Sequence, residues 1–301
     1  MSEDTQRWQL GDVRFTAVVE AETVGIPPEF FFPDASADLV RSVDLEPGVA
    51  GEDGTIGLRV QAVVIEAGGR TVLVDPCVGN HKPRSQFFWD QQDWPFMERF
   101  RAAGFTPEGI DLVVHTHLHA DHVGWDTHLV DGRWAPTFTN ARHLYVDGEL
   151  ARLRASAEGG TGTDRDPDDA ALHGDSVAPI VDAGLADIVA ADTDLGGGLR
   201  LVPTFGHTPH HVALWVDTPA GSAALVGDSV LHPLQCALPE LAFAGDQDVD
   251  ATVATRKGLL DEVAASGALL MPAHFPARPV GRVRAEGAAW RFVPEEGSTG
   301  A

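Results

Sequence analysis

The segment His117-Leu118-His119-Ala120-Asp121-His122 is the feature that most restricts what this chain can fold into. Three imidazoles and a carboxylate fall within six consecutive positions, directly after the apolar stretch 110–114. Imidazole and carboxylate are natural ligands of Zn²⁺ and similar ions. An exposed loop or a hydrogen-bonded core position would explain one histidine. This density of ligand-type side chains instead indicates a metal site.

The spacing of these residues predicts how they are shared between ions. Residues two apart in an extended segment lie on the same side, so His117 and His119 can converge on one ion. We expect the chain to turn at Asp121 and His122, which would let these two side chains face a second ion.

Three more candidate ligands stand at the ends of apolar, strand-like runs. His207 lies in the tight Gly206-His207-Thr208-Pro209 loop, Asp228 ends the run 223–228, and His274 follows the run 268–273. Each alone is weak evidence, because acids and imidazoles at strand ends are common. Because all three follow the first segment in this order, we interpret them together as one set of further metal ligands.

Together these motifs resemble those of the metallo-β-lactamase-fold hydrolase superfamily. The matching segments are Thr116 to His122, Gly206-His207-Thr208-Pro209, Gly227-Asp228, Pro272-Ala273-His274 and Leu73-Val74-Asp75-Pro76. The resemblance implies that one ion is held by His117, His119 and His207, that the other is held by Asp121, His122 and His274, and that Asp228 bridges both. It implies two divalent ions, with Zn²⁺ favoured and Mn²⁺, Fe²⁺ or Co²⁺ compatible with the carboxylates.

This ligand set predicts a hydrolytic mechanism. Two ions that share a carboxylate lower the pKa of a bridging water, and the resulting hydroxide attacks a carbonyl or phosphoryl group that one ion polarises. Asp121 and Asp228 are therefore the predicted catalytic residues. Asp121 would orient the hydroxide and shuttle its proton.

The residues around the ligands give further predictions. Asp75 and His211 are expected to hydrogen-bond ligands, whereas a structural role is favoured for His115 and His210. Predicted substrate contacts are Trp125, His232, Phe88 and Trp89, although packing in the core would also explain aromatic residues in loops. Many relatives that open acyl-homoserine lactones have Tyr where this chain has Leu231. The region more loosely resembles methyl parathion hydrolase and broad lactonase-like enzymes.

Periodicity predicts the mixed α/β class, and the resemblance adds a four-layer αββα sandwich. Strands are expected at 13–24, 56–74 with a turn at Gly68-Gly69, 111–116, 199–202, 213–216, 223–226, 268–271 and 281–293; helices at 94–103, 147–157 and 251–265. We expect one domain over residues 1–301, with covering loops at about 25–55. A length of 301 residues with 44% hydrophobic content suits one large core.

Charge and cysteine content restrict the partners. With 21 basic and 45 acidic side chains, the formal net charge is -24, which would repel nucleic acid. Two cysteines are too few for a disulfide framework, and neither a signal peptide nor a membrane span is expected. We expect a cytoplasmic enzyme with a small-molecule substrate, no nucleic-acid or membrane partner, and a homodimer left open.

The predicted function is metal-dependent hydrolysis of a small apolar lactone or ester, with a phosphotriester as a further substrate class. The alternatives are a mononuclear-iron sulfur dioxygenase of the same fold and a β-lactam hydrolase. A flavodiiron-like protein usually has an acid where this chain has His119. A non-catalytic protein with a relict site is disfavoured, because all seven expected ligands are present.

Overall fold

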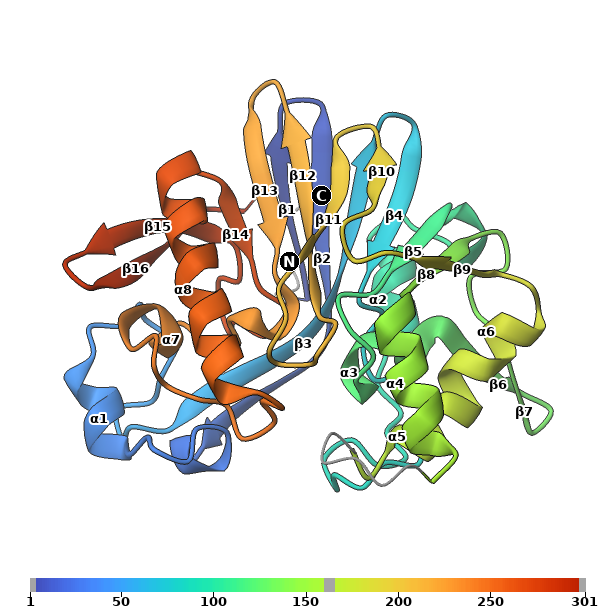
Figure 1. Cartoon of the computed structure of the whole chain (residues 1–301), viewed down its shortest axis with the longest axis horizontal. Coiled ribbons are helices and arrows are strands. Elements are labelled where there is room, and N and C mark those ends of the chain that lie inside the picture. The colour runs from blue at the N-terminus through green and yellow to red at the C-terminus, as the bar shows by residue number, and fades with distance from the viewer. Residues whose placement is uncertain (1–3, 160–165, 298–301) are drawn as a thin grey trace. The chain divides into compact units, whose positions relative to one another are not determined.

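A computed structural model describes residues 4–159 and 166–297. The chain divides into two compact units (Figure 1). Among the described residues, the first unit contains 4–20, 60–159 and 166–191, and the second contains 21–59 and 192–297. Each unit has its own sheet and its own buried apolar cluster, so each is described by itself.

The first unit is built on a seven-stranded mixed sheet. Its order is β1-β2-β3-β4-β5-β8-β9, with bounds Thr5–Leu10, Val13–Ile26, Ile56–Ala67, Arg70–Val74, Leu112–Val114, Arg142–Val146 and Ala186–Val189. The pairs β4/β5, β5/β8 and β8/β9 are parallel, so their carboxyl ends lie at one edge. Asp75 directly follows β4 and His115 directly follows β5, so this edge is where the first histidine motif begins.

The first unit also contains several short helices. They are α2 Phe96–Ala102, α3 Ala120–Val123, α4 Asp147–Ala157, α5 Asp169–Leu172, a π-helical turn His173–Val177 and α6 Ala178–Asp182, with short 3-10 turns at Pro107–Gly109 and Gly124–Asp126. Phe96 and Phe100 on α2 are fully buried in an apolar cluster with Val113, whereas Leu150 and Leu153 of α4 belong to a second cluster. A two-stranded hairpin, β6 Thr127–Val130 and β7 Arg133–Pro136, follows the metal motif.

The second unit contains the other mixed sheet, in strand order β10 to β16. The strands are Asp194–Gly196, Leu199–Pro203, Val212–Thr218, Gly221–Leu225, Leu269–Met271, Gly281–Glu286 and Ala289–Pro294. β13 and β14 are parallel, and β11 runs in their direction because each of the pairs β11/β12 and β12/β13 is antiparallel. The three strands therefore end at the same edge of the sheet. Each is followed by one predicted ligand loop.

Helix α8, Val249–Ser266, covers this second sheet. It begins at Asp248, whose side chain accepts a hydrogen bond from Ala251 N, and ends at Gly267, which has the left-handed conformation that glycine favours. Leu260 and Val263 of the helix are fully buried against Trp215. Shorter helices are α1 Ala37–Ser42 and α7 Leu234–Ala237, with 3-10 turns at Pro28–Phe30 and Gly227–Ser229.

The structure confirms most of the expected elements and corrects others. Helix α4 has the predicted bounds, and the strands β3 and β4 turn at Gly68-Gly69 as expected. Asp121 and His122 lie in the one-turn helix α3 rather than in an open turn. The strands β1, β6, β7, β8, β9 and β10 were not predicted. The sequence also predicts a flexible connection at 159–169, rich in Gly, Thr and Asp, and this segment lies largely outside the described residues.

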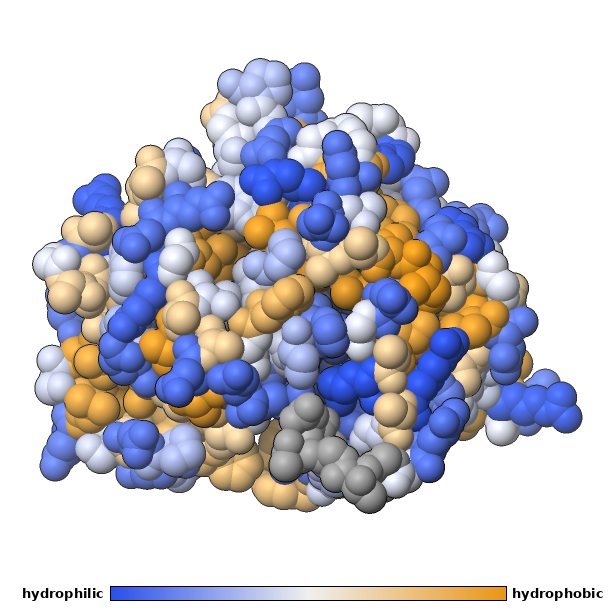
Figure 2. Space-filling model, viewed as in Figure 1, coloured by the Kyte–Doolittle hydropathy of each residue, from blue (hydrophilic) through white to orange (hydrophobic). Residues whose placement is uncertain are grey.

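Much of the visible surface is hydrophilic (Figure 2). Figure 2 shows hydrophilic residues, in blue, over much of one face, with apolar residues exposed between them. Among residues 4–159 and 166–297, no helix has the length and apolar character that crossing a membrane requires.

Candidate metal centre

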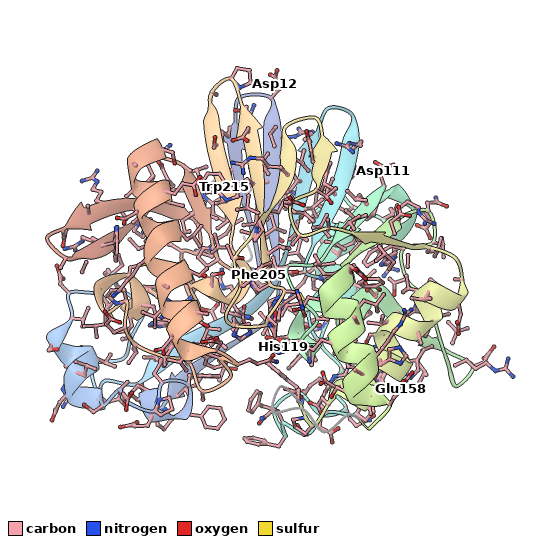
Figure 3. The ribbon with its side chains drawn as sticks, viewed as in Figure 1. Asp12, Asp111, His119, Glu158, Phe205 and Trp215 are labelled. Atoms are coloured by element: carbon pink, nitrogen blue, oxygen red, sulfur yellow. The ribbon has the colours of Figure 1, made fainter. Side chains whose placement is uncertain are left out.

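The first unit brings together four predicted ligands at the end of β5. His117 Nε2 lies 3.0 Å from His119 Nδ1, and the ring of His122 is centred 4.1 Å from that of His117. Asp121 Oδ1 lies 3.6 Å from His122 Nε2. His117, Asp121 and His122 are buried, whereas His119, labelled in Figure 3, is partly exposed. These side chains form a compact, partly accessible group of metal-type donor atoms.

Asp75 supports this group from the neighbouring strand β4. One carboxylate oxygen accepts a hydrogen bond from Thr116 N and the other accepts one from Thr116 Oγ1, both at 2.8 Å. Its Oδ2 also lies 3.1 Å from His122 Nδ1. The contact orients the His122 ring, because its Nε2 is then directed toward Asp121.

Glu149, near the start of α4, is a second support that the sequence alone does not identify. Its buried carboxylate accepts a hydrogen bond from Leu118 N at 3.2 Å. Leu118 stands between the ligands His117 and His119, so this bond fixes the backbone of the motif itself. A glutamate in the first turn of a helix has an ordinary helix-forming explanation, and no sequence signal therefore distinguishes it.

The second unit brings together the other three predicted ligands, each from a loop at the same sheet edge. Asp228 lies between two imidazoles: its Oδ1 is 3.1 Å from His274 Nε2 and its Oδ2 is 3.5 Å from His207 Nε2. All three side chains are almost fully buried. The loop that contains His207 follows β11, which ends at Pro203, and includes Phe205, which Figure 3 labels.

The outer nitrogens of both imidazoles are anchored. His207 Nδ1 donates to Asp246 Oδ1 at 3.0 Å, and His274 Nδ1 donates to the Arg59 carbonyl oxygen at 2.7 Å. Asp246 therefore also supports a ligand, His207. The sequence does not predict this role, because Asp246 lies 39 positions from His207 in a polar segment. His211, the predicted support in this unit, accepts a hydrogen bond from Asp228 N at 3.2 Å through Nε2.

This arrangement suits a metal ion. With each Nδ1 protonated, the Nε2 atoms of His207 and His274 carry lone pairs in the neutral ring, and both point toward the carboxylate of Asp228. Two lone-pair atoms at such distances repel one another unless a proton or a cation lies near both. The donor types, two imidazoles and a carboxylate, are those that Zn²⁺ and related ions prefer.

The predicted substrate contacts are mostly covered within their own units. Trp125 is stacked on Phe96 with ring centroids 5.5 Å apart, and its Nε1 donates to Glu20 Oε1 at 2.6 Å. Burial raises the pKa of Glu20 to about 7, although hydrogen bonds from Val78, Trp125 and Gly79 lower it. Trp125 is therefore held by a buried acid that the sequence did not single out.

His232 is fully buried in the second unit. Its Nδ1 accepts a hydrogen bond from Leu234 N at 3.2 Å, and its ring lies 6.1 Å from that of Phe32. Burial lowers the pKa of His232 to about 3. The ring is therefore neutral at physiological pH, which suits a hydrogen-bonding or packing role rather than a charged one.

Phe88 and Trp89 are half-buried in the segment between β4 and α2. Their rings make an edge-to-face contact at 5.2 Å, and Phe87 beside them is 82% exposed. Phe88 and Trp89 are thus the more exposed of the predicted substrate contacts, and together with Phe87 they form an apolar group at the surface.

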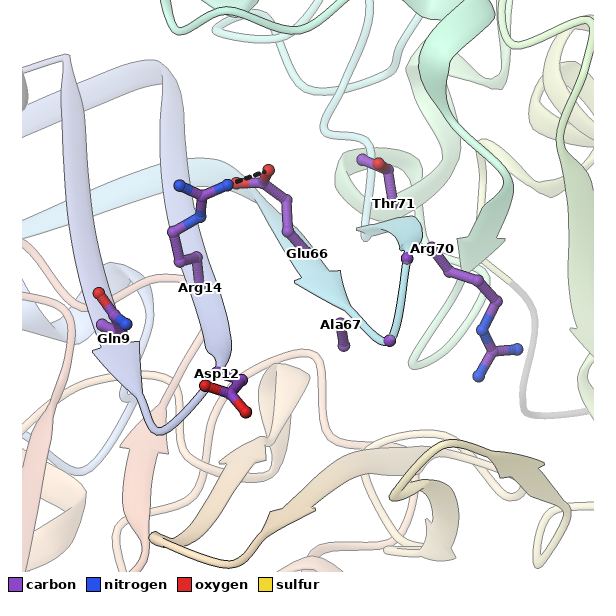
Figure 4. A pocket seen from close by; sticks show the side chains of 9 residues that line it. Gln9, Asp12, Arg14, Glu66, Ala67, Arg70 and Thr71 are labelled. Atoms are coloured by element: carbon purple, nitrogen blue, oxygen red, sulfur yellow. Dashed lines mark hydrogen bonds and ion pairs between the residues drawn. The ribbon is translucent and has the colours of Figure 1, made fainter.

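A separate hollow lies between the β1–β2 and β3–β4 turns (Figure 4). An ion pair of 2.8 Å between Arg14 and Glu66 crosses it, and both side chains are partly exposed. Its lining is that of a solvated polar surface, unlike the buried ligand groups above.

The comparisons with known proteins agree with the motifs. The family model described as the metallo-beta-lactamase superfamily matches residues 55–267. The chain belongs to this superfamily. Within it, the motifs place the chain among the metal-dependent hydrolases. The predicted fold class, an α/β metallo-β-lactamase fold with two mixed sheets flanked by helices, is confirmed.

Several solved structures share the fold at low sequence identity. The hydrolase AbOPH of the beta lactamase superfamily is 22% identical, with a TM-score of 0.78, over 98% of this chain and 99% of that one. AidC, a dizinc quorum-quenching lactonase, is 18% identical with a TM-score of 0.77 over the same shares. A probable metal-dependent hydrolase from Staphylococcus aureus is 15% identical, with a TM-score of 0.72, over 96% and 99%. No curated protein matches the sequence.

Proposed function

We propose that the chain is a dinuclear metal-dependent hydrolase that cleaves a small apolar lactone or ester, with phosphotriesters as a further substrate class. In this proposal one ion is held by His117, His119 and His207, the other by Asp121, His122 and His274, and Asp228 bridges them. The observation that carries the proposal is the position of Asp228 between the Nε2 atoms of His207 and His274, whose outer nitrogens are anchored.

The ions would supply a water of lowered pKa and would polarise the bond to be cleaved. The residues of the chain would orient the water, accept its proton and hold the metal ligands in place. Asp121 is the acid of the first group, and its position beside His122 suits it to orient the attacking water and accept its proton. Asp75 and Asp246 hold the imidazoles His122 and His207 in fixed orientations, so the donor atoms need little reorganisation. The imidazole-rich first set favours Zn²⁺.

Two observations support a small, uncharged or apolar substrate. The formal net charge of -24 disfavours polyanions such as nucleic acid. The aromatic group of Phe87, Phe88 and Trp89 offers apolar surface outside the core. The structural neighbours include lactonases, two of them with the product N-hexanoyl-L-homoserine bound. We extend that substrate class to this chain as a proposal, with Trp125, His232, Phe88 and Trp89 as substrate contacts.

The experiment is a screen of the metal-reconstituted protein against lactones, aryl esters, phosphotriesters and β-lactams. We expect hydrolysis of a lactone or aryl ester that is lost in Asp228→Ala and His119→Ala. His81→Ala is the matched control, because His81 is exposed and belongs to neither ligand group. Oxygen uptake with one bound iron per chain and no hydrolysis would replace the proposal with a sulfur dioxygenase. Hydrolysis of β-lactams alone would correct the substrate class.

A further inference from the structure

A second cluster of ligand-type side chains lies in the first unit, next to the histidine motif but outside the proposed metal ligands. It consists of His115, Asp126, His143 and Tyr145, all of them fully buried. His115 directly precedes Thr116 at the end of β5, Asp126 follows α3, and His143 and Tyr145 lie on β8. The proposed function uses none of the four.

Asp126 is the centre of this cluster. Its Oδ1 accepts a hydrogen bond from His143 Nδ1 at 3.0 Å, and its Oδ2 accepts one from the Tyr145 hydroxyl at 2.7 Å. His115 Nε2 lies between the two carboxylate oxygens, 3.1 Å from Oδ1 and 3.0 Å from Oδ2. Three donors from two strands thus share a single buried carboxylate.

His115 is held on both sides. Its Nδ1 lies 3.0 Å from the Leu144 carbonyl oxygen, which can only accept a hydrogen bond. Its Nε2 faces the Asp126 carboxylate, so both ring nitrogens lie against hydrogen-bond acceptors. Although burial raises the pKa of Asp126, the imidazoles of His115 and His143 lower it well below its usual range.

These contacts close a loop around the metal motif. The segment 116–125 contains four proposed ligands, and its two ends are joined by the His115–Asp126 pair. The pair is bound in turn to β8 through Leu144 and Tyr145. Removing one partner of these buried hydrogen bonds is costly, because the groups that remain buried lose their hydrogen-bond partner.

The far end of the segment is also fixed through its backbone. Gly124 N donates to the Cys77 carbonyl at 2.7 Å and Trp125 N donates to the Pro76 carbonyl at 2.8 Å. These two hydrogen bonds therefore hold the backbone immediately before Asp126. The Asp126 carboxylate connects this backbone to His115, at the end of β5 where the motif begins.

We propose that Asp126 and His115 are positioning residues that hold segment 116–125 in its metal-binding conformation before any ion is bound. This inference rests on the proposed function, since it concerns the same ligands. The residues act through the backbone and do not touch substrate. Their removal should weaken metal retention more than the accompanying loss of stability explains.

The same three groups, His115, Asp126 and His143, lie within 4.8 Å of one another, so an ion could in principle replace their hydrogen bonds. The donors on His115, His143 and Tyr145 already satisfy the Asp126 carboxylate without an ion. We therefore favour the hydrogen-bonded cluster, and the metal stoichiometry separates the two interpretations.

The test measures metal release from Co²⁺-loaded full-length protein to an excess of a chromophoric chelator, together with the Co²⁺ absorption spectrum and thermal melting. We expect Asp126→Ala to accelerate release by about 10- to 100-fold, as substitutions behind metal ligands typically do. Asp126→Asn, which keeps an acceptor oxygen, should restore part of the loss. Phe100→Leu, in the core of the same unit, is the matched control for general destabilisation and should leave release unchanged.

Each result either supports or contradicts the positioning role of Asp126 and His115. Wild-type release rates and an unchanged spectrum in folded Asp126→Ala would overturn it. If that variant does not fold, Tyr145→Phe removes one donor to Asp126, and unchanged release in this variant would overturn the inference instead. A third ion per chain that is lost in His143→Ala would show that the cluster is itself a metal site. Failure of the wild-type protein to bind metal would reject the proposed function, not this positioning role alone.

Discussion

His207 Nδ1 donates a hydrogen bond to Asp246 Oδ1 at 3.0 Å, and this contact directs His207 Nε2 toward Asp228. The Asp246 side chain is fully buried, and its other oxygen accepts a hydrogen bond from Phe243 N at 2.9 Å. We predict that Asp246→Ala lowers metal affinity by about 10- to 100-fold. Asp246→Asn should lose less metal affinity, because its amide oxygen can still accept a hydrogen bond from His207 Nδ1. Chelator competition measures the affinities, and equal affinity in the alanine variant would contradict the role.

The tight contact at Gly124 predicts a large loss of stability on substitution. A Cβ at this position would lie 1.7 Å from the Val78 carbonyl oxygen, so the backbone of one segment would have to move. We expect Gly124→Ala to lower the free energy of unfolding by about 2 kcal/mol or more, in the range of overpacked cores. Gly174→Ala is the matched control, because a Cβ at Gly174 would meet no atom within 4 Å. Equal denaturation midpoints in urea for the two variants would refute this interpretation.

Glu20 predicts a pH dependence of stability. Burial raises its pKa from an ordinary value of 4.5 to about 7. Between these values the folded protein holds a proton that the unfolded chain has lost, so the free energy of unfolding falls as the pH rises and levels off above about 7. The full effect is about 3 kcal/mol.

Glu20→Gln should remove this slope while keeping an acceptor for Trp125 Nε1. Urea denaturation of both proteins from about pH 5 to about pH 8 measures the difference. We expect the variant to gain stability relative to the wild type as the pH rises. A difference that is constant across this range would show that Glu20 does not titrate there.

The aromatic group predicts a specific effect on substrate affinity. Phe88→Ala should raise KM for esters with a long acyl chain, while metal content and kcat for a short ester stay unchanged, because the ring belongs to no ligand group. Phe30→Ala is the control, since Phe30 is an exposed aromatic residue outside the group of Phe87, Phe88 and Trp89. Steady-state kinetics over an acyl-length series separates the two. The same change in KM for both variants would mean that Phe88 has no particular contact with substrate.

The metal motifs and many of the strands could be predicted because they are local patterns. Helix α4 shows helical spacing of its apolar residues, and the runs before His117, Asp228 and His274 are continuously apolar because parallel strands are buried on both faces. These runs also explain why the ligands stand at a sheet edge.

Asp75 and His211 were predicted as supporting residues, but Glu149, Asp246 and Asp126 could not be, because their partners are distant in sequence. Asp246 lies in a polar segment, and the cluster of His115 and Asp126 depends on β8, a strand that contains His143 and Tyr145 and has no clear alternating pattern. Only tertiary structure shows that His115 is paired with an acid. The sequence favours a structural role for His115 but does not identify its partner.

Metal content decides whether the ligand groups form a dinuclear site. Protein purified without chelator is analysed by mass spectrometry of its metals, beside Asp228→Ala and the surface control His81→Ala. We expect two divalent ions per chain in the wild type and in His81→Ala, with a clear loss in Asp228→Ala. No bound ion in the wild type after reconstitution, or an unchanged content in Asp228→Ala, would contradict a dinuclear site bridged by Asp228.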